Sequence, residues 1–414
     1  MRFALSLLFV AFVSLLAAAD RPLFRTDADG PVRADDKRPN AKNRKPIDKP
    51  DWYQLVPGEF PPEGSVHAVS GELMFMDHLE RRFHLRVDRN DSQERGVWDL
   101  PLDATMLPYG SIWHLGAPAA LQDIPLGTHH HGLFYLADPD DKTPLPETSY
   151  RRKTPEWQFR RCFRLEDEFT FHTRQKQLWR IDSVDLGTKK LTATLVAGGK
   201  PVGDGKAKTF DLTTSTRVFK GNGFADLKAL QPGQTVLFNL TWVTLYGPGR
   251  ITDLWLDEPA RALATAHQLE RHRNHTRERG LPGFVSAVDD EAQIVTITFF
   301  GGVDPKLFED IRNVDTNKVG WPLAKEADNQ AAPKGTIAVA RESLMTYDPV
   351  NDRKGGNVVD IKTIPAEPGS SGLQIKVKCD LLLEGFRPRR VVRFYPATWK
   401  VMALPREEQF FGRE

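Results

Sequence analysis

Gly64-Ser65-Val66-His67-Ala68-Val69 and Gly283-Phe284-Val285-Ser286-Ala287-Val288 share the pattern Gly-x-Val-x-Ala-Val, although they lie in opposite halves of the 414-residue chain. Trp179-Arg180-Ile181-Asp182-Ser183-Val184 fits the same frame less closely, at a similar interval from each. Alternation of apolar and polar residues with a period of two is typical of half-buried β-strands. The recurrence therefore predicts three β modules, each beginning with an equivalent strand.

Further signals follow the first strand of each predicted module in the same order. A hairpin signal such as Gly203-Asp204-Gly205 comes first, and a later glycine then opens another strand at Gly127-Thr128, Gly233-Gln234 and Gly335-Thr336. Short strands at such intervals favour small closed barrels, because closure removes exposed strand edges. The expected fold is mainly β, with three tandem small β-barrel (OB-like) or sandwich modules. These cover residues 51–150, which are rich in histidine, residues 178–257, and residues 281–414 with an insertion around 301–334.

Short helices are expected to join the modules, over 151–177 and 258–280. In the first helix Glu166-Asp167-Glu168 comes early and Arg174 comes late, which is the order of charges that a helix dipole favours. The second helix places apolar residues on one face and stops at Gly280, a residue type that commonly ends helices.

The first 50 residues are predicted to lie outside the modules. An apolar run after Arg2, followed by Ala17-Ala18-Ala19, is typical of a secretory signal peptide over 1–19. Residues 20–50 mix both charges with several prolines, a composition that favours a disordered leader. No later stretch reaches the roughly 18 apolar residues of a spanning helix. We therefore expect an extracytoplasmic protein, periplasmic or secreted, without a transmembrane segment in its mature chain.

Composition argues against several classes of protein. Lys+Arg 57 against Asp+Glu 55 gives a net charge of +2, so there is no strong nucleic-acid signal. The 2 cysteines are too few for a disulfide scaffold or a four-cysteine zinc site, and we expect Cys162 and Cys379 not to pair. The sequence lacks a Gly-x-Ser-x-Gly elbow, a Walker loop, a Rossmann glycine pattern and a His-Glu-x-x-His motif. No familiar catalytic motif is therefore available.

Several strings resemble an uncharacterised family of secreted multi-module β proteins from planctomycete-type bacteria. They are Leu107-Pro108-Tyr109-Gly110, Gly116-Ala117-Pro118-Ala119, Asp123-Ile124-Pro125-Leu126-Gly127-Thr128-His129 and Leu382-Leu383-Glu384-Gly385-Phe386-Arg387-Pro388. The resemblance covers most of the chain after the leader, and the modules also look distantly like OB-type barrels. It implies export and a modular build, and it carries over no catalytic residues.

Most of the 11 histidines fall in the first module, and three of them are consecutive. On a strand, His129 and His131 point to one face and His130 points to the other. In the frame of the repeat, His129 and His131 correspond to Thr235 and Leu237 in the second module and to Ile337 and Val339 in the third. This alignment indicates an inward or interfacial face.

His129 and His131 are the predicted metal ligands if the chain holds a metal ion. Two imidazoles on one face can bind Zn²⁺ or Cu²⁺ when another strand supplies a third ligand, for which His67, His114 and Asp123 are candidates. Hydrogen-bonded structural histidines are the alternative, since three consecutive histidines define no ligand geometry. Because only two ligands can be placed, we expect no cofactor, and less than stoichiometric zinc or copper.

Three functions stay open. The leading hypothesis is an exported, non-enzymatic protein with a binding or cell-envelope structural role, whose partner would be a cell-envelope protein or a polysaccharide. The second is a metal-dependent hydrolase or oxidoreductase that uses the first-module histidines. The third is an OB-like binder of nucleic acid or polysaccharide, in which tryptophans such as Trp113 and Trp242 would stack on bases or sugars.

Overall fold

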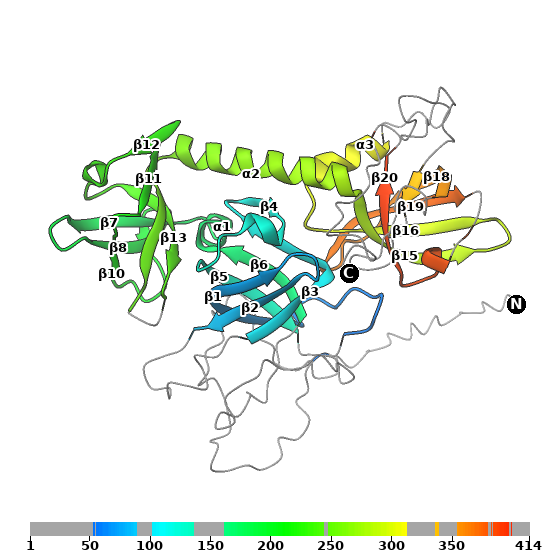
Figure 1. Cartoon of the computed structure of the whole chain (residues 1–414), viewed down its shortest axis with the longest axis horizontal. Helices are drawn as coiled ribbons and strands as arrows, with labels where there is room; N and C mark the ends of the chain where they lie inside the picture. Colours follow the sequence, from blue (N-terminus) through cyan, green and yellow to red (C-terminus); the bar gives the residue numbers. More distant parts are fainter. Residues whose placement is uncertain are drawn as a thin grey trace, which may run out of the picture.

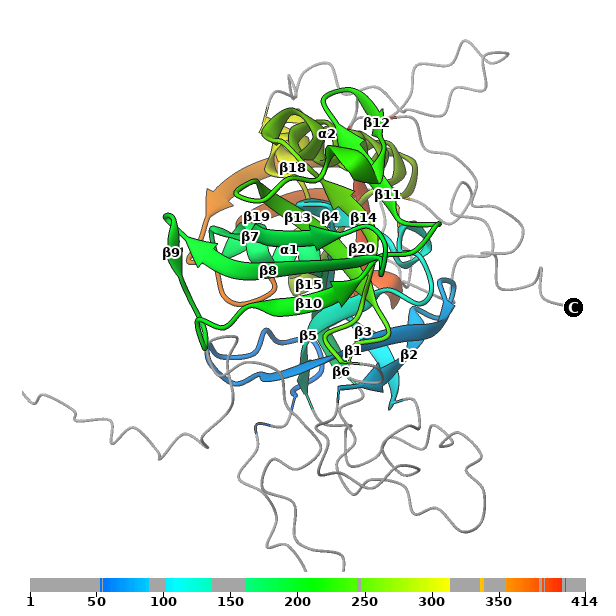
Figure 2. The same cartoon turned by 90° about the vertical axis from the view of Figure 1, so that its left-hand side faces the viewer.

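The chain is mainly β, as predicted, and its strands form three small closed sheets (Figure 1). A computed structural model describes residues 53, 55–88, 102–135, 161–243, 247–312, 336–338, 354–379, 382, 384–396 and 399. The predicted signal peptide and leader, and most of the predicted insertion, lie outside these residues. The long helix α2 (Glu258–Arg279) runs alongside the sheets, and Figure 2 looks onto the second of them from the end.

The first barrel is a ring of five strands in the order β2-β1-β5-β6-β3, which a β2–β3 pairing closes. β3 and β6 run parallel, whereas the other four pairings are antiparallel. A closed ring of five strands is the architecture of an OB-type barrel. The elements are β1 (His67–Asp77), β2 (Arg82–Val87), β3 (Leu102–His114), β4 (Ala117–Ala119), η2 (Leu121–Asp123), β5 (His129–Tyr135) and β6 (Arg161–Asp167).

The second barrel has the same connectivity in its five main strands. Their order is β8-β7-β13-β14-β10, and β10 closes the ring by pairing with β8 and, in parallel, with β14. The strands are β7 (Gln177–Asp185), β8 (Lys190–Ala197), β10 (Lys208–Asp211), β13 (Thr235–Thr241) and β14 (Arg250–Trp255). Smaller elements flank them: β9 (Lys200–Pro201), β11 (Arg217–Lys220), β12 (Gly223–Ala225) and η3 (Leu227–Ala229).

The third barrel differs from the other two, because six strands close it and every pairing is antiparallel. The strands are β15 (Leu281–Asp289), β16 (Ile294–Phe300), β17 (Thr336–Ala338), β18 (Lys354–Thr363), β19 (Ser370–Cys379) and β20 (Val391–Tyr395). Three short helices accompany them: η4 (Pro305–Phe308), α3 (Glu309–Arg312) and η5 (Glu384–Phe386). Cys379 lies in this core and Cys162 in the core of the first barrel, and they are not joined to each other, as predicted.

The first strand of each barrel makes the same pair of backbone hydrogen bonds, beside a shift in strand register. The pairs join Leu73 to Gly127 and Thr128, Ile181 to Gly233 and Gln234, and Val285 to Arg389 and Arg390. The sequence frame is therefore correct for Ile181 and Val285, but the counterpart in the first barrel is Leu73 and not Val66. In the third barrel Arg389, with φ of 73°, takes the place that the frame gave to Gly335.

The same contacts correct the positions assigned to the histidines. His129 lies opposite Glu72 on β1, and Thr235 lies opposite Arg180 in the second barrel, as the frame predicts. The counterpart in the third barrel is Val391, which lies opposite Phe284, and not Ile337. Thr336 begins β17, whereas the counterpart of the His129 position lies on β20, so the sequence alignment of the third module is wrong at this point.

The linker helix predicted over 151–177 is wrong for residues 161–167, which form β6. Within the described residues 161–177, only α1 (Glu168–Arg174) is helical. The order of charges agrees with this short helix. Cys162 and Leu165, however, fill the core of the first barrel, where β6 pairs with both β5 and β3. Barrel closure thus overrides the local helix signal, as tertiary packing commonly does.

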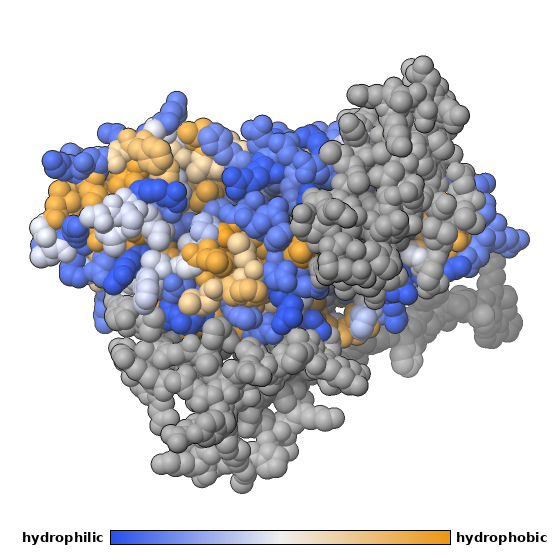
Figure 3. All heavy atoms as spheres, in the orientation of Figure 1, coloured by the Kyte–Doolittle hydropathy of each residue, from blue (hydrophilic) through white to orange (hydrophobic). Residues whose placement is uncertain are grey.

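The helix predicted over 258–280 is present as α2, and it contacts all three barrels. Its first turn packs Ala260 against Trp255 of the second barrel. Gln268 Nε2 donates to Pro118 O of the first barrel at 3.2 Å, and Arg273 pairs with Asp304 next to the third. On the face in Figure 3 the surface of α2 is hydrophilic, whereas hydrophobic residues gather over the second barrel.

A cluster of aromatic rings joins the first barrel to the third. Tyr109 of β3 lies 5.7 Å from Phe284 of β15, measured between ring centroids, and Phe284 lies 4.8 Å from Phe300 of β16. Phe60 packs against all three rings from the segment before β1. Such offset and edge-to-face contacts stabilise beyond simple burial, so this interface holds the two barrels together.

Acid is expected to loosen the packing of α2 against the third barrel through His272. Burial lowers the pKa of His272 to about 4, although Asp304 and Asp123 partly oppose the shift, and its Nε2 accepts from Asp304 N. The unfolded chain binds a proton below pH of about 6.5, so stability falls as pH drops from there toward 4. Between pH 7 and pH 4.5 this titration lowers the free energy of unfolding by about 2 kcal/mol, and we expect that loss to be absent in His272→Gln. Urea unfolding at pH 7 and pH 4.5 measures it.

His267→Gln is the control for this prediction, because His267 is exposed on the same helix. It should keep the acid sensitivity of the natural chain. An equal acid loss in His272→Gln and in His267→Gln would show that His272 does not titrate as its burial demands.

Candidate functional site

His129 and His131 contact the same carboxylate, that of Glu168. His129 Nδ1 lies 2.5 Å and His131 Nε2 lies 3.0 Å from Glu168 Oε1. The two histidines share a face of β5, as the alternation of a strand predicts. Glu168 reaches them because α1 begins directly after β6, and β6 is the neighbour of β5 in the sheet.

The other ring nitrogen of His129 meets a second carboxylate. His129 Nε2 lies 2.9 Å from Asp88 Oδ2, and Ser70 Oγ donates to the same oxygen at 2.6 Å. Burial alone would lower the pKa of His129, but Asp88 and Glu168 outweigh it and raise that pKa to about 10. In turn, the histidines hold the pKa of both buried carboxyls below the usual range. Without a metal ion, His129 is thus a cation between two anions.

One turn further along α1, His172 completes the cluster. Its Nε2 lies 3.1 Å from Glu168 Oε2, and its Nδ1 lies 3.0 Å from Gln177 Oε1. The ring of Phe171 stacks on the ring of His131, with centroids 3.7 Å apart and planes 13° apart. Both oxygens of Glu168 are therefore engaged by imidazoles, and the orientation of His131 is fixed by packing.

The donor set of this cluster suits a divalent transition metal. The ligand atoms of His129, His131 and Glu168 all lie within 4.8 Å of one another. Two imidazoles and one carboxylate form the ligand set of many zinc sites, and a carboxylate on the far nitrogen of a ligating histidine is a common outer contact. His129 and Glu168 are only 2% and 5% exposed, so the cluster offers little room for a substrate.

The remaining candidate residues lie elsewhere. His130 occupies the opposite side of β5 and is fully buried. Its Nδ1 donates to Thr128 O at 2.9 Å, and burial lowers its pKa to about 4. His114 pairs with Asp167, and Asp123 accepts from Ala120 N and from Gln268. The side chain of His67 lies outside the described part of the structure. Neither His114 nor Asp123 therefore provides the predicted third ligand.

Glu168 is the site residue that the sequence does not reveal. In the sequence it stands only as part of the acidic run Glu166-Asp167-Glu168, whose charges match the dipole of a linker helix. Recognising β6 as the last strand of the first barrel would have placed this run next to β5. Cys162 and Leu165 both fill the core, but they lie three residues apart across a shift in strand register, so simple alternation does not identify this strand.

Asp167, the residue before Glu168, joins the first two barrels and α1. Its carboxylate accepts from Leu115 N at 3.1 Å, Asn239 Nδ2 at 2.9 Å and Thr170 N at 2.9 Å, and His114 Nδ1 lies 2.8 Å away. Burial opposes its charge, but His114 and these hydrogen bonds lower the pKa of Asp167 far below its usual value. The side chain therefore stays ionised at the junction.

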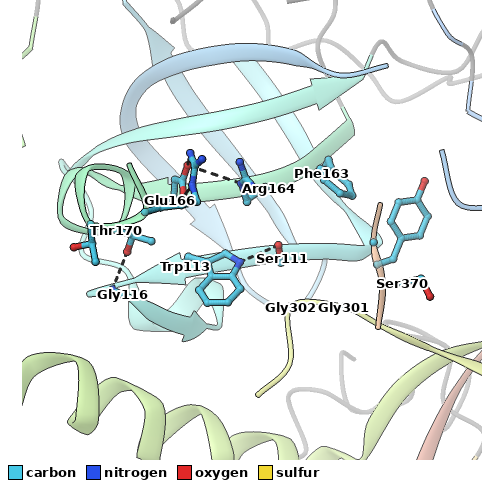
Figure 4. A pocket seen from close by; sticks show the side chains of 14 residues that line it. Ser111, Trp113, Gly116, Phe163, Arg164, Glu166, Thr170, Gly301, Gly302 and Ser370 are labelled. Carbon is cyan, nitrogen blue, oxygen red and sulfur yellow. Dashed lines mark hydrogen bonds and ion pairs between the residues drawn. The ribbon is translucent and has the colours of Figure 1, made fainter. Parts of the chain in front are cut away.

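A cleft of about 440 Å³ opens between the first and third barrels (Figure 4). Figure 4 shows the charged side chains of Arg164 and Glu166 on β6 beside the indole ring of Trp113 on β3. Arg174 of α1 holds Glu166 through two hydrogen bonds, at 3.1 and 2.5 Å. The lining consists of Tyr109, Ser111, Trp113, Gly116, Phe163, Arg164, Glu166, Thr170, Thr173, Arg174, Gly301, Gly302, Gly369 and Ser370.

Comparisons with known proteins assign no function to these residues. No protein-family model matches the chain, and no curated protein is similar to it. Among solved structures, the chain is similar to a copper(II)-bound variant of CusF from Escherichia coli. The identity is 15%, the match covers 20% of this chain and 90% of CusF, and the TM-score of 0.15 is too low to support an argument. Among the described helices, none is long and apolar enough to cross a membrane.

Removing the charge of Asp167 should destabilise the chain strongly. In Asp167→Asn we expect a loss of about 3 kcal/mol in the free energy of unfolding, because the amide leaves several buried donors badly matched. Asp257→Asn is the matched control, since Asp257 caps α2 in the same way that Asp167 caps α1 and has one further donor, Gly221 N, which an asparagine oxygen can still accept. Asparagine caps helices as well as aspartate, so the control should lose less than about 0.5 kcal/mol. Urea unfolding measures both losses in the free energy of unfolding. Similar losses in the two variants would show that Asp167 contributes no more than a helix cap does.

Proposed function

We propose that this chain is an exported binding protein that takes a saccharide in the cleft between its first and third barrels. The cleft is the observation that carries the proposal, because its volume of about 440 Å³ falls within the range of small-molecule sites. Export rests on the signal-peptide pattern of residues 1–19 and on the family resemblance. Both supports are compatible with a role in the cell envelope.

The lining of the cleft suits a sugar. The aromatic rings of Trp113 and Phe163 offer faces on which the C–H side of a sugar ring packs. The charged groups of Arg164 and Glu166 offer polar partners to hydroxyl groups. Aromatic rings beside polar groups are the combination that fixes the orientation of an amphipathic ligand.

Charge argues against a nucleic acid as the ligand. Glu166 places a carboxylate in the cleft next to the two arginines, and Arg174 is already bound to it. A polyphosphate would require unopposed cations, and the whole chain carries a net charge of only +2. A neutral or weakly charged oligosaccharide avoids this conflict.

The cleft also has rigid walls. One side is formed by β3 and β6 of the closed first barrel, and the other by the Gly301–Gly302 and Gly369–Ser370 segments of the third. Gly301 N donates to Gly369 O at 2.6 Å, which ties these two segments together. Gly302, with φ of 72°, brings its backbone so close to Ser111 that a Cβ would lie 2.3 Å from the Ser111 Cβ. The glycine thus sets the distance between the two walls.

Substitution of Trp113 should weaken saccharide binding. Titration of the mature chain with neutral oligosaccharides of β-linked glucose and N-acetylglucosamine is expected to change the tryptophan fluorescence in a saturable manner. In Trp113→Ala the dissociation constant should rise roughly tenfold, the usual cost of a lost stacking face. Calorimetric titration of the same ligands, which does not depend on a fluorophore, measures the change.

Trp242→Ala is the control, because Trp242 is a partly exposed tryptophan of the second barrel, remote from the cleft lining. It should bind as the natural chain does. Lack of binding to every saccharide would refute the proposal, and so would equal weakening in both variants. Binding only to a nucleic acid, with an affinity that falls steeply with salt, would favour the nucleic-acid alternative.

A further inference from the structure

We infer that His129, His131 and Glu168 form a binding site for one divalent transition-metal ion such as Zn²⁺, and that the ion has a structural role. The inference goes beyond the proposed function and does not rest on the cleft. The expectation of less than stoichiometric metal rested on a missing third ligand. Glu168 of α1 now stands where that ligand is needed, within 2.5 Å of His129 Nδ1 and 3.0 Å of His131 Nε2.

The three ligands come from two elements whose relative position is fixed. β5 carries both histidines and pairs with β6, and α1 continues from β6 without an intervening loop. Asp167 locks this transition by capping α1 and by accepting from Leu115 N and Asn239 Nδ2. The donor atoms of the site are thus brought together by the fold and need no mobile segment.

Each ligand is also held by a partner of its own. Asp88 binds the far nitrogen of His129 at 2.9 Å and is itself held by Ser70. His172 contacts the second oxygen of Glu168 at 3.1 Å, and the ring of Phe171 stacks on His131. Outer contacts of this kind orient metal ligands and raise their affinity, and a purely structural histidine pair does not require all of them.

The chemistry of the donors selects the metal. Two imidazoles with one carboxylate suit Zn²⁺ and Cu²⁺, whereas Mg²⁺ and Ca²⁺ prefer oxygen ligands alone. A divalent ion would also balance the charges of Asp88 and Glu168, two carboxylates that are 4% and 5% exposed. Because His129 and Glu168 are nearly inaccessible, the ion would stabilise the fold and would not act on a substrate.

The test uses the full mature chain, stripped of metal by chelation and then titrated with Zn²⁺ by calorimetry. We expect one equivalent to bind and the melting temperature to rise with it. In His131→Ala and in Glu168→Gln this binding should be lost, while Asp88→Asn should weaken it roughly tenfold to a hundredfold. His78→Gln is the matched control, because His78 is an exposed histidine of the same barrel, and it should bind normally.

A second measurement keeps the inference testable if a variant does not fold. Co²⁺ bound to the natural chain should give the visible absorption of a nitrogen and oxygen ligand set, and Zn²⁺ should displace it. Failure of the natural chain to bind either ion at one equivalent would overturn the inference. The cluster would then be a set of protonated histidines hydrogen-bonded to carboxylates. Binding that persists in a folded His131→Ala or Glu168→Gln chain would equally overturn it. Preference for Cu²⁺ with the same variant pattern would support the site and identify copper as its ion.

Discussion

Asp167 brings a buried negative charge to the point where β6 becomes α1, and donors from three parts of the molecule converge on it. Leu115 N and His114 come from the first barrel, Asn239 from the second, and Thr170 N from the helix. An ionised carboxylate is stable in such a place only while its partners remain, because the cost of an uncompensated buried charge is several kcal/mol. Separation of the first two barrels would remove Asn239 from the carboxylate. The charge therefore couples the junction of the barrels to the geometry of α1.

At this junction the side chains of four consecutive residues, 165–168, point into four different parts of the molecule. Leu165 enters the core of the first barrel, Glu166 enters the cleft, Asp167 enters the junction, and Glu168 reaches the histidines of β5. The first three follow from the alternation of a strand, and the fourth from the turn into the helix. One short segment thus sets the positions of both candidate sites.

The repeated Val, Ile, Thr and Phe alternation was enough to predict a mainly β chain of small barrels, and the strand alternation placed His129 and His131 on one face. The glycine at the strand crossing was equally informative in the first two barrels, where Gly127 and Gly233 take positive φ angles. It failed in the third, because Arg389 adopts that conformation without being glycine. The role of Glu168 could not be predicted for a different reason. Charge order within one segment reports the helix dipole, whereas a contact between β5 and α1 depends on closure of the barrel, which no local pattern records.

The first barrel contacts the second and the third barrel through different kinds of interaction. This difference explains how a cleft can lie beside the interface with the third barrel. Toward the third barrel, Tyr109, Phe284 and Phe300 bury aromatic surface, which stabilises without demanding one exact arrangement. Toward the second barrel, Phe169 of α1 packs on Trp255, and polar, directional contacts are added to this packing. Thr241 donates to Glu72, which also pairs with Arg86, and Asn239 donates to Asp167. Buried polar contacts are satisfied in a single orientation, so they specify how the barrels meet. Both interfaces thus bury apolar surface, and the hydrogen bonds toward the second barrel add a fixed geometry. β6, held between the two interfaces, presents Arg164 and Glu166 to the cleft at a fixed position.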